Sequence, residues 1–519
     1  MSFSGRGVSP DLQVHAAQQN SMDASLVLGI DVSTDSAAVI VAETEGRVLA
    51  QARQRFREAT RDGLAPGYQE QNPTTWWNAT CACLRQIIAT LQELHRSPDE
   101  IVAAAVDSTS GTIVLLDQNN QPLRPALMHN DQRAQAQADR LNGELAKMPK
   151  PRGFQFEPTF ALPKIVWLVQ HEPDIWKETR RVVHAADFIV GKLTGVFDIS
   201  DQSHVLKTGF DLLNSEWPAF IETDLGIELR RLPRVIRSGE TIARVSSAGA
   251  AETGLSQKTR VVAGMARGAA DQVASGARRV GDWNTALGST LTFRGLTKRP
   301  LFDPLGRVYS DLHPLGYWMS SSSTNTGERA LVERFAHADR NAFNRAALTL
   351  SPTALVVYDP SQPGERLLFN RADARGFIEG SASSEQELYA AYLEGIAYVE
   401  RMAYGVLESL GAEIRERIYT SGNGFNSVEW MQIRADVMGL ETASAAQAYP
   451  AMGSAIVAAS RTLFDNIADA TAAMVQIDQV ISPRPTKVPR YNEVFQRFLA
   501  ACRQRGYDSG LVRIGVASA

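Results

Sequence analysis

The stretch LVLGIDVSTDSAAVIVAE, residues 26–43, decides how this chain is expected to fold. It opens on an apolar run typical of a buried strand, passes through a polar turn, and returns in a second apolar run. Another short turn and the stretch VLAQARQRF (48–56) predict a third strand, so the three strands should form an antiparallel meander. Asp31 lies at the end of the first strand, and Ser33 and Thr34 lie in the turn. Such a turn presents hydroxyls and backbone N–H groups to an anion, but an ordinary surface turn has the same composition.

Further elements follow on both sides of the middle of the chain. We predict a helix over 72–95, strands at 101–107 and 112–117, and helical structure throughout 162–195. The second half reopens with a strand at 260–265, a helix that starts in ADQVASGARR (270–279), and strands at 284–289 and 291–297. After these we predict a helix over 385–410, a strand at 417–422, a helix from Val428 and a closing helix over 491–506.

The second half therefore echoes the first, with an apolar strand and a polar turn near its start. This predicts two related α/β domains, over 26–258 and 259–519, that join near 257–260. Residues 1–25 are polar and are expected to form a disordered leader.

Composition limits the class of protein. The chain has 519 residues, more than one core usually supports, with 44% hydrophobic and 21% charged residues, which is typical of a globular protein. A net charge of −4 and the lack of a basic stripe argue against nucleic acid as a partner. The sequence also has no apolar segment long enough to suggest a membrane helix. Cys81, Cys83 and Cys502 are expected to be reduced core thiols, which favours the cytoplasm; a metal role for Cys81 and Cys83 is the alternative.

Three more polar segments could carry chemistry. Asp271 closes the cluster GMARGAAD (264–271) and is expected in the first turn of a helix, as a functional carboxylate or as a plain N-terminal residue. The turn formed by Gly288, Ser289 and Thr290 could grip phosphate, and the turn formed by Gly422, Asn423 and Gly424 could admit a nucleotide to a helix N-terminus. Either could equally be a surface turn, and neither has the spacing of a Walker A or dinucleotide motif.

These segments, in this order, resemble the FGGY family of carbohydrate kinases over about residues 26–474. The resemblance also rests on GYQEQNPTTWW (67–77), HNDQRA (129–134), AADFIVGKLTG (185–195), SGNGFNSVEWMQIRADVMG (421–439) and MGSA (452–455). It implies two actin-like, ribonuclease H-like domains with a ligand cleft between them. The N-terminal domain would bind the sugar and the C-terminal domain the nucleotide.

The resemblance also implies roles for residues, with ATP and Mg²⁺ as cofactors. Asp271 would contact the sugar and act as the general base, and Asp31 would serve the metal. The phosphate contacts would come from Ser33, Thr34, Gly288, Ser289 and Thr290. Gly422, Asn423 and Gly424 would lie along the nucleotide. Ser33 stands where most members have Gly, and the order Gly-Ser-Thr replaces Gly-Thr-Ser, but both changes keep hydroxyls and turn character.

The sugar is indicated by Asp107, Ser108 and Thr109, which follow the core strand. Glycerol kinases have an Arg-Glu pair there and bacterial xylulokinases a Met-His pair, so this stretch looks closer to ribulose and xylulose kinase relatives. It favours phosphorylation of a terminal hydroxyl of D-xylulose or D-ribulose, although Asp107 could instead cap the strand. The alternatives are a kinase for another linear polyol or signalling sugar, and a sensor that has lost catalysis. The resemblance also suggests a homodimer, because family members are often dimers.

Overall fold

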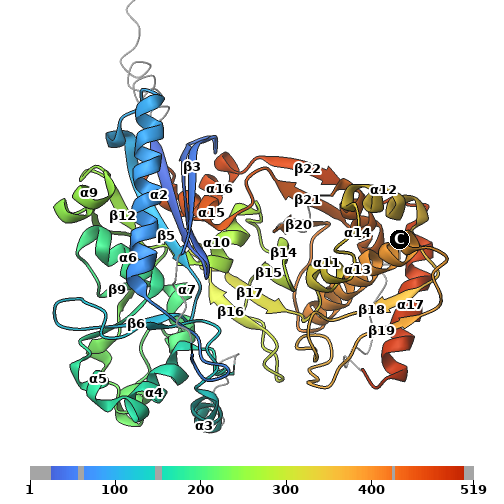
Figure 1. The fold of residues 1–519 in the computed structure, drawn as a ribbon, viewed down its shortest axis with the longest axis horizontal. Coiled ribbons are helices and arrows are strands. Elements are labelled where there is room, and N and C mark those ends of the chain that lie inside the picture. Colours follow the sequence, from blue (N-terminus) through green and yellow to red (C-terminus); the bar gives the residue numbers. More distant parts are fainter. Residues whose placement is uncertain (1–24, 57–62, 146–154, 423–426, 508–519) are drawn as a thin grey trace, which may run out of the picture. The chain divides into compact units, whose positions relative to one another are not determined.

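The computed structural model describes residues 25–56, 63–145, 155–422 and 427–507, and Figure 1 shows their helices and strands. The chain divides into two compact units. Unit 1 is Met1–Ala138, Glu157–Ala270 and Pro450–Val475, and unit 2 is Asp139–Phe156, Asp271–Tyr449 and Gln476–Ala519. The predicted leader lies, except for Ser25, outside the described residues. In the ranges that are described, no helix is long and apolar enough to cross a membrane.

Unit 1 contains most elements of the first half of the chain and two helices from near its end. Its strands are β1 (Leu26–Val32), β2 (Ser36–Glu43), β3 (Val48–Arg55), β4 (Glu70–Gln71), β5 (Ile101–Ser108), β6 (Ile113–Leu116), β7 (Ala126–Leu127), β8 (Arg181–His184), β9 (Ile199–Asp201), β10 (Arg234–Ile236), β11 (Thr241–Arg244), β12 (Arg260–Val262) and β13 (Met265–Ala266). Its helices are α2 (Pro73–Glu93), α4 (Ala161–His171), α5 (Pro173–Glu178), α6 (Ala185–Thr194), α7 (Gln202–Val205), α8 (Phe220–Thr223), α9 (Ser247–Thr253), α15 (Pro450–Ala459) and α16 (Ile467–Met474).

The main sheet of unit 1 has the order β11-β12-β5-β1-β2-β3, with β13 beside β5. Strands β1 to β3 are antiparallel neighbours, which confirms the predicted meander, whereas β1 and β5 are parallel. Every residue of β1 is buried, as expected for a strand covered on both faces. Helices α2 and α6 pack on one face and α15 on the other, as the left part of Figure 1 shows.

Helix α2 illustrates how local sequence sets an element. Asn72 caps it by accepting the backbone N–H of Thr74 at 3.0 Å, and Pro73 occupies the first turn, where a missing N–H costs nothing. The predicted span 72–95 agrees with the observed helix to within two residues at each end. The closing helix, α17, and the long helix α13 are likewise confirmed.

Close packing of α15 on β1 depends on a glycine. A Cβ atom placed on Gly29 would lie 1.8 Å from the backbone oxygen of Ala451 and 2.6 Å from the nitrogen of Ala455. On the other side of α15, a Cβ on Gly453 would lie 1.9 Å from the backbone oxygen of Ala270. Glycine at these two positions therefore lets α15 approach both the sheet and helix α10 (Arg267–Ala274) at backbone distance.

The prediction of helical structure throughout 162–195 is wrong. Pro173 starts a second helix after α4, and the stretch Arg181–His184 is a strand, β8, that pairs with β6. Val182 and Val183 favour a strand, and the partner that stabilises it lies far away in the sequence. A local apolar pattern could not reveal that partner.

Unit 2 is built mainly from residues 271–449. Its strands are β14 (Trp283–Leu287), β15 (Leu291–Thr297), β16 (Tyr309–Leu312), β17 (Trp318–Ser323), β18 (Val356–Tyr358), β19 (Phe377–Glu379), β20 (Arg417–Ser421), β21 (Glu441–Ala445) and β22 (Ile477–Ile481). Its helices are α11 (Glu328–Arg334), α12 (Arg340–Leu350), α13 (Glu385–Ser409), α14 (Val428–Met438) and α17 (Val488–Gln504), while α3 (Gln135–Leu145) and α10 each span the sequence boundary between the units.

The sheet of unit 2 repeats the pairing pattern of unit 1. Its order is β16-β17-β15-β14-β20-β21-β22. Strand β14 pairs antiparallel with β15 and parallel with β20, as β1 pairs with β2 and β5. The predicted echo between the two halves is therefore present in the topology, and the turns after β1 and β14 occupy equivalent places.

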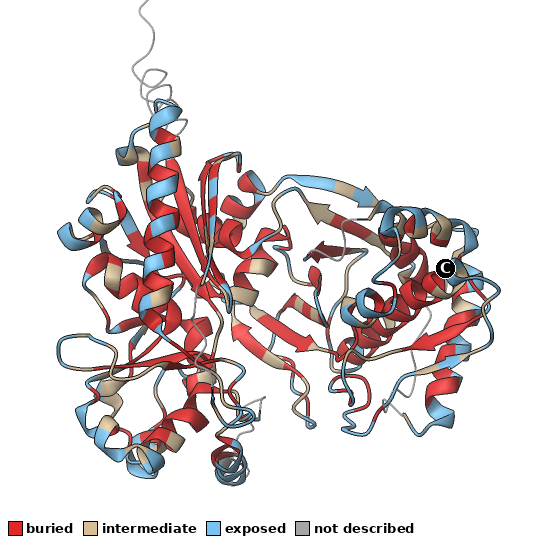
Figure 2. Cartoon of the chain, viewed as in Figure 1, coloured by how far each residue is buried: buried red, intermediate tan, exposed pale blue. Residues whose placement is uncertain are grey.

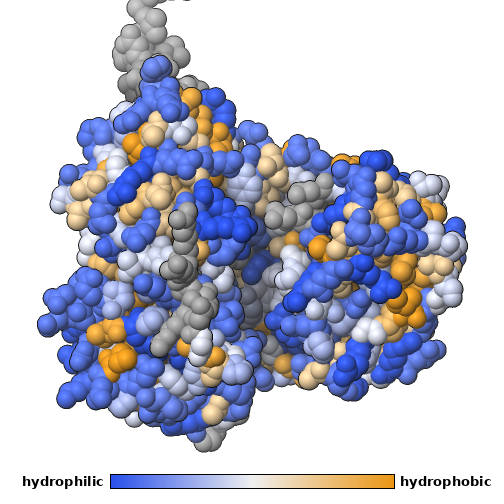
Figure 3. All heavy atoms as spheres, viewed as in Figure 1, coloured by the Kyte–Doolittle hydropathy of each residue, from blue (hydrophilic) through white to orange (hydrophobic). Residues whose placement is uncertain are grey.

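Burial separates the core of unit 2 from its edge. Figure 2 shows α13 mostly buried and the edge strand β22 mostly exposed. The face drawn in Figure 3 is mostly hydrophilic, and its apolar residues form separate groups. This is the usual surface of a globular protein.

Candidate active site

In unit 1, the parallel strands β1 and β5 bring two carboxylates together. Asp31 and Asp107 are direct register partners, and both are buried. Side chains of paired residues point to the same face of a sheet, and here that face is covered by α15, since Ser454 of that helix donates to Asp107 Oδ2 at 2.7 Å. The sequence placed both residues at strand ends, but it did not show that they are neighbours.

The pair is electrostatically unusual. Complete burial, and then the negative charge of Asp31, raise the pKa of Asp107 well above its usual range. The Oδ1 atom of Asp107 is buried without a hydrogen-bond partner among the described residues. The place is therefore suited to a cation or a proton that would relieve the repulsion between the two groups.

Arg267 is a member of this group that the sequence analysis did not select. Its Nε donates to Asp31 Oδ1 at 2.9 Å, and its side chain is 42% exposed. The residue lies within the cluster 264–271, four positions before Asp271, so the signal was present in the sequence.

The turn after β1 is ordered by its own hydroxyls. Ser33 Oγ donates to the backbone oxygen of Ser36 and accepts the backbone N–H of that residue. Gln71 donates to the backbone oxygen of Thr34 at 2.8 Å, and Trp76 donates to Gln71 in turn. The segment 67–77 therefore supports the turn that was predicted to face phosphate.

In unit 2, Asp271 lies in a small polar cluster. Ser421 Oγ donates to Asp271 Oδ2 at 2.7 Å, and Asn284 Nδ2 lies 2.9 Å from Ser421 Oγ and 3.4 Å from Asp271 Oδ2. These bonds fix the orientation of the carboxylate. Helix α10 begins at Arg267, so the prediction that Asp271 lies in its first turn is wrong by one turn.

Ser421 and Asn284 are residues that the sequence analysis missed. Ser421 ends β20 and opens the segment quoted for the family resemblance, and Asn284 lies on the neighbouring strand β14. Only the pairing of these two strands, which is not visible in the sequence, brings them to Asp271.

The turn of Gly288, Ser289 and Thr290 is supported by the segment around Gly327. Backbone bonds join Glu328 N–H to the oxygen of Gly288 at 3.0 Å, and a Cβ on Gly327 would lie 2.5 Å from the oxygen of Ser289. Gly288 and Ser289 are exposed, as a ligand-binding turn requires. The carbonyl oxygens of Gly288 and Ser289 accept hydrogen bonds from Glu328 and Ser361 within unit 2.

Gly422 has a φ of +88°, and a Cβ on it would lie 2.4 Å from the backbone oxygen of Leu287, so only glycine suits this position. The other two residues of that predicted turn, Asn423 and Gly424, lie outside the described residues. The turn itself follows β20 and precedes α14, which confirms the predicted strand and helix around it.

Ser108 and Thr109 behave differently from Asp107. The Ser108 hydroxyl is buried and lies 2.9 Å from His204 Nε2, while it accepts the backbone N–H of Ala186 at 3.0 Å. Thr109 is half-buried, and its hydroxyl bonds to that of Thr112 at 2.9 Å. The Ser108 side chain is thus already engaged within unit 1.

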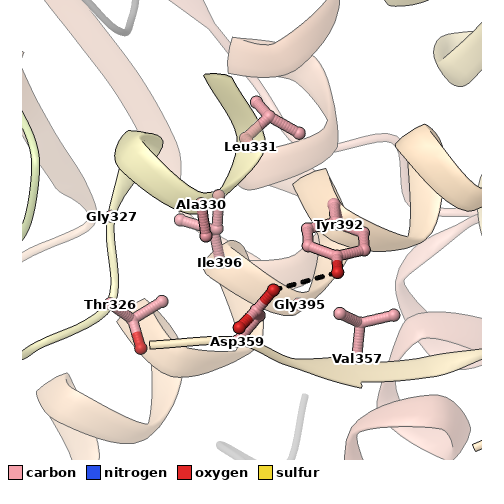
Figure 4. A pocket seen from close by; sticks show the side chains of 9 residues that line it. All are labelled: Thr326, Gly327, Ala330, Leu331, Val357, Asp359, Tyr392, Gly395 and Ile396. Atoms are coloured by element: carbon pink, nitrogen blue, oxygen red, sulfur yellow. Dashed lines mark hydrogen bonds between the residues drawn. The ribbon is translucent and has the colours of Figure 1, made fainter. Parts of the chain in front are cut away.

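A hollow in unit 2 with a cavity volume of about 10 Å³ is lined by Thr326, Gly327, Asp359, Tyr392 and four apolar residues with Gly395 (Figure 4). Tyr392 donates to Asp359 Oδ2 at 2.9 Å, as the dashed line in Figure 4 marks. A cavity of this size has room for about one water molecule, whereas ligand pockets usually measure roughly 300–1,000 Å³, so the hollow is too small for a nucleotide.

The cysteines are free and buried, as predicted. Burial raises the pKa of Cys81 and Cys83 to about 11 and that of Cys502 to about 12, so these thiols are inert. Within the part of the chain that the structure describes, no group of three or more His, Cys, Asp or Glu side chains could hold a metal ion on its own.

Models of the N-terminal and C-terminal domains of the FGGY family of carbohydrate kinases match residues 26–276 and 305–461. The chain is 25% identical over 492 residues to a xylulose kinase of Bacillus subtilis (strain 168). The matched region covers 91% of this chain and 95% of that protein.

Two solved structures have a similar fold. A xylulose kinase from Rhodospirillum rubrum matches with a TM-score of 0.80 and 24% identity over 93% of this chain and 99% of its own. A gluconate kinase from Lactobacillus acidophilus matches with a TM-score of 0.81 and 18% identity over 94% and 99%. Proteins named for different sugars match equally well, so the fold does not select the substrate.

Both family models match in the expected order and together cover most of the chain, including Asp31, Asp107 and Asp271. The mixed α/β fold with two domains is the one that the family resemblance implies. This chain belongs to the FGGY family of carbohydrate kinases: it is a phosphotransferase with ATP and a carbohydrate as its substrates.

Proposed function

We propose that this enzyme transfers the γ-phosphoryl group of ATP to a terminal hydroxyl of a ketopentose, D-xylulose or D-ribulose. The observation that carries the choice of sugar is the similarity to relatives named xylulose kinase, which match over most of both chains. Asp107 and Thr109 beside the end of β5 are the side chains proposed to meet a substrate rich in hydroxyls, since the Ser108 hydroxyl is bonded within unit 1.

Asp271 is the proposed general base. It would accept the proton of the sugar hydroxyl as that oxygen attacks phosphorus, a contribution typically worth roughly 10²–10⁴ in rate. The hydrogen bond from Ser421 supports this role, since it holds the carboxylate in one orientation. Asp107 and Thr109 would contact the sugar, and Ser108, whose hydroxyl is bonded within unit 1, would act through the position of the loop.

The two predicted phosphate turns would bind ATP. Ser33 and Thr34 would serve one side, and Gly288, Ser289 and Thr290 the other, with Gly422, Asn423 and Gly424 along the nucleotide. A ligand cleft between the two domains and the domain boundary at 258–259 stay predictions from the sequence.

Mg²⁺ is proposed at Asp31. Magnesium is usually held by one or two carboxylates together with phosphates and waters. The neighbouring Asp31 and Asp107 carboxylates are suitable ligands of this kind. The Oδ1 atom of Asp107, for which the described residues supply no hydrogen-bond partner, also fits a nearby cation. When bound, the ion would neutralise charge that develops on the phosphates. Buried, free cysteines support a cytoplasmic enzyme, and family habit supports a homodimer.

The test is an ADP-release assay across ketopentoses, aldopentoses, hexoses, gluconate and glycerol. A substrate too small to pair a buried polar group of the site loses about 1–3 kcal/mol of binding for each such group. Because ~1.4 kcal/mol corresponds to a factor of about ten, two such losses lower kcat/KM by a factor that approaches about a hundred. We therefore expect D-xylulose or D-ribulose to have a kcat/KM at least about a hundredfold above that of glycerol. Glycerol, gluconate or another polyol as the best substrate would refute the ketopentose assignment and leave the kinase assignment intact.

A further inference from the structure

Asp201 of unit 1 is a buried carboxylate that lies where β9 ends and α7 begins. Its Oδ1 atom accepts the backbone N–H groups of Ser203 and His204 at 2.9 and 3.0 Å, so it caps α7. Its Oδ2 atom lies 2.5 Å from His204 Nδ1. One carboxylate thus fixes both the backbone and the imidazole ring of His204.

The first arm of this network reaches β5. His204 Nε2 lies 2.9 Å from the hydroxyl of Ser108, the last residue of that strand. Successive side chains of a strand point to opposite faces, so Asp107 points away from His204 and towards Ser454. The end of β5 is therefore held from both faces of the sheet, by His204 on one and Ser454 on the other.

The second arm reaches β13. Ser203 Oγ donates to Asp201 Oδ1 at 2.6 Å and accepts the backbone N–H of Ala266 at 2.6 Å. Ala266 is the register partner of Ser108 and directly precedes Arg267, the residue that pairs with Asp31. Both arms of Asp201 therefore end one residue away from a charged side chain of the candidate site.

The charge of Asp201 also sets the hydrogen positions along the first arm. Burial would lower the pKa of His204, but the charge of Asp201 raises it on balance, and the pKa of Asp201 is lowered despite its burial. An ionised carboxylate can only accept, so His204 Nδ1 carries the hydrogen of that bond. The nitrogen that faces Ser108, Nε2, then accepts from the Ser108 hydroxyl when the ring is neutral and donates to it when the ring is charged.

A second buried network of hydrogen bonds, which also links a carboxylate, a histidine and a hydroxyl, offers a comparison. His184 bonds to Asp187 Oδ2 at 2.7 Å through Nδ1 and to Thr208 Oγ1 at 2.8 Å through Nε2, and it is also buried. This network reaches the end of β5 only through the backbone, because Ala186, which directly precedes Asp187, donates its N–H to Ser108. His184 Nδ1 also lies 3.1 Å from Ser200 Oγ, but within the described part of the chain no hydrogen bond joins the His184 ring to Ser108, so its replacement leaves the His204–Ser108 bond in place.

We propose that Asp201 is a positioning residue for the kinase reaction, which holds Asp107 and Arg267 in place through His204 and Ser203. The inference rests on the proposed function, in which Asp107 contacts the sugar. Asp201 itself is buried and touches no reacting atom; it acts on the site by fixing two strand ends.

Asp201→Asn tests the first arm with little other change. The amide oxygen can still cap α7, but an N–H donor replaces the oxygen that accepts from His204, so Nδ1 must become an acceptor and the carboxylate no longer holds the ring in its Nδ1-protonated form. We expect the KM for the sugar to rise about tenfold or more, as is typical when a residue that orients a site is changed, while kcat and the KM for ATP stay within about threefold. His184→Gln is the matched control, with its sugar KM within about threefold of wild type.

Hydrogen exchange of the ligand-free protein gives a readout that does not need activity. Asp201→Asn should speed amide exchange in residues 104–110 relative to both wild type and His184→Gln. Faster exchange together with a raised sugar KM supports the proposal. An unchanged sugar KM, or equal effects in both variants, would overturn it and leave Asp201 a structural residue.

The two hypotheses fail in different ways. If the wild-type enzyme prefers a sugar outside the ketopentoses, the proposed substrate is wrong, and the variants are compared on the preferred sugar instead. If no exchange difference appears at 104–110, the positioning role is wrong whatever the substrate.

Discussion

Asp31 and Asp107 sit opposite each other on neighbouring parallel strands, and both are buried on the face of the sheet that α15 covers. Burial and the negative charge of Asp31 disfavour the ionised form of Asp107 unless a cation is near. Arg267 supplies one such cation to Asp31. This relationship underlies the first prediction.

Asp31→Asn should raise the Mg²⁺ concentration needed for half-maximal turnover by roughly tenfold or more, because it removes a carboxylate proposed to hold the ion. The measurement is ADP release as a function of Mg²⁺ at saturating ATP and sugar. Asp35→Asn is the control, since Asp35 lies in the same turn but is exposed, and its side chain contacts the described residues Ser33, Ser36 and Arg53. Identical Mg²⁺ curves for wild type and Asp31→Asn would contradict the metal assignment.

Asp271→Asn should lower kcat by roughly 10²–10⁴ while the melting temperature and ADP binding change little, because an amide is isosteric but cannot accept the proton. Ser421→Ala, which removes the bond to the carboxylate and the bond from Asn284 but keeps the carboxylate itself, should cause a smaller loss. The comparison needs single-turnover rates for both variants. A kcat for Asp271→Asn above about a tenth of the wild-type value is incompatible with a base at this position.

Gly29→Ala should be strongly destabilising. Its new Cβ would lie 1.8 Å from a backbone oxygen of α15, which cannot move aside as a flexible side chain could. Overpacking of a core typically costs about 1–3 kcal/mol and occasionally more, and we expect the upper end here. The midpoint of thermal unfolding, followed by circular dichroism, measures the effect.

The control for this substitution is Gly143→Ala on helix α3, where a Cβ would meet nothing within 4 Å. Alanine there should stabilise the helix by roughly 0.5–1 kcal/mol. If both alanine variants melted at the wild-type temperature, the close approach of α15 to β1 would be wrong.

The two histidines His204 and His313 should affect stability with opposite dependence on pH. The pKa of His204 is raised from 6.5 by Asp201, so its contribution is fully present below pH 6.5 and is lost as the pH rises through the folded-state value. Burial lowers the pKa of His313 to about 4, so below pH 6.5 the unfolded chain binds more protons and this residue weakens the fold.

We therefore expect His204→Gln to destabilise the protein more at pH 5.5 than at pH 9, whereas His313→Gln should cost more at pH 9. Asp201 and Asp187 are the carboxylates that act on His204, and His184 is the neighbouring ring. Denaturant unfolding of both variants and wild type at the two pH values measures the differences. The same trend for both variants would show that the Asp201–His204 pair is not charged in the folded protein.

Local sequence predicted much of the fold. Short apolar runs with polar turns between them were enough for β1, β2 and β3, and the caps and apolar spacing were enough for α2, α13 and α17. The strand β8 was missed because its partner β6 lies more than 60 residues earlier, so only tertiary pairing explains it.

The site was predictable in part for the same reason. Asp31 and Asp107 stand at strand ends and Asp271 lies in the helix that follows β13, places that local reasoning can detect. Ser454 lies 347 positions from its partner Asp107, Ser421 lies 150 positions from Asp271, and His204 lies 96 positions from Ser108, so nothing local marks these partners. Composition could not show that the Ser108 hydroxyl bonds to His204 and Ala186 in the interior of unit 1.

Helix α15 has a consequence for how the protein is made. It covers the second face of β1 and β5, yet the ribosome synthesises it more than 340 residues after β5 begins. Until then, the nascent chain carries an apolar sheet face with no cover, the kind of surface that chaperones bind and that aggregates when it stays exposed. A fragment that stops at residue 276, where the match to the N-terminal family model ends, would keep that face bare permanently.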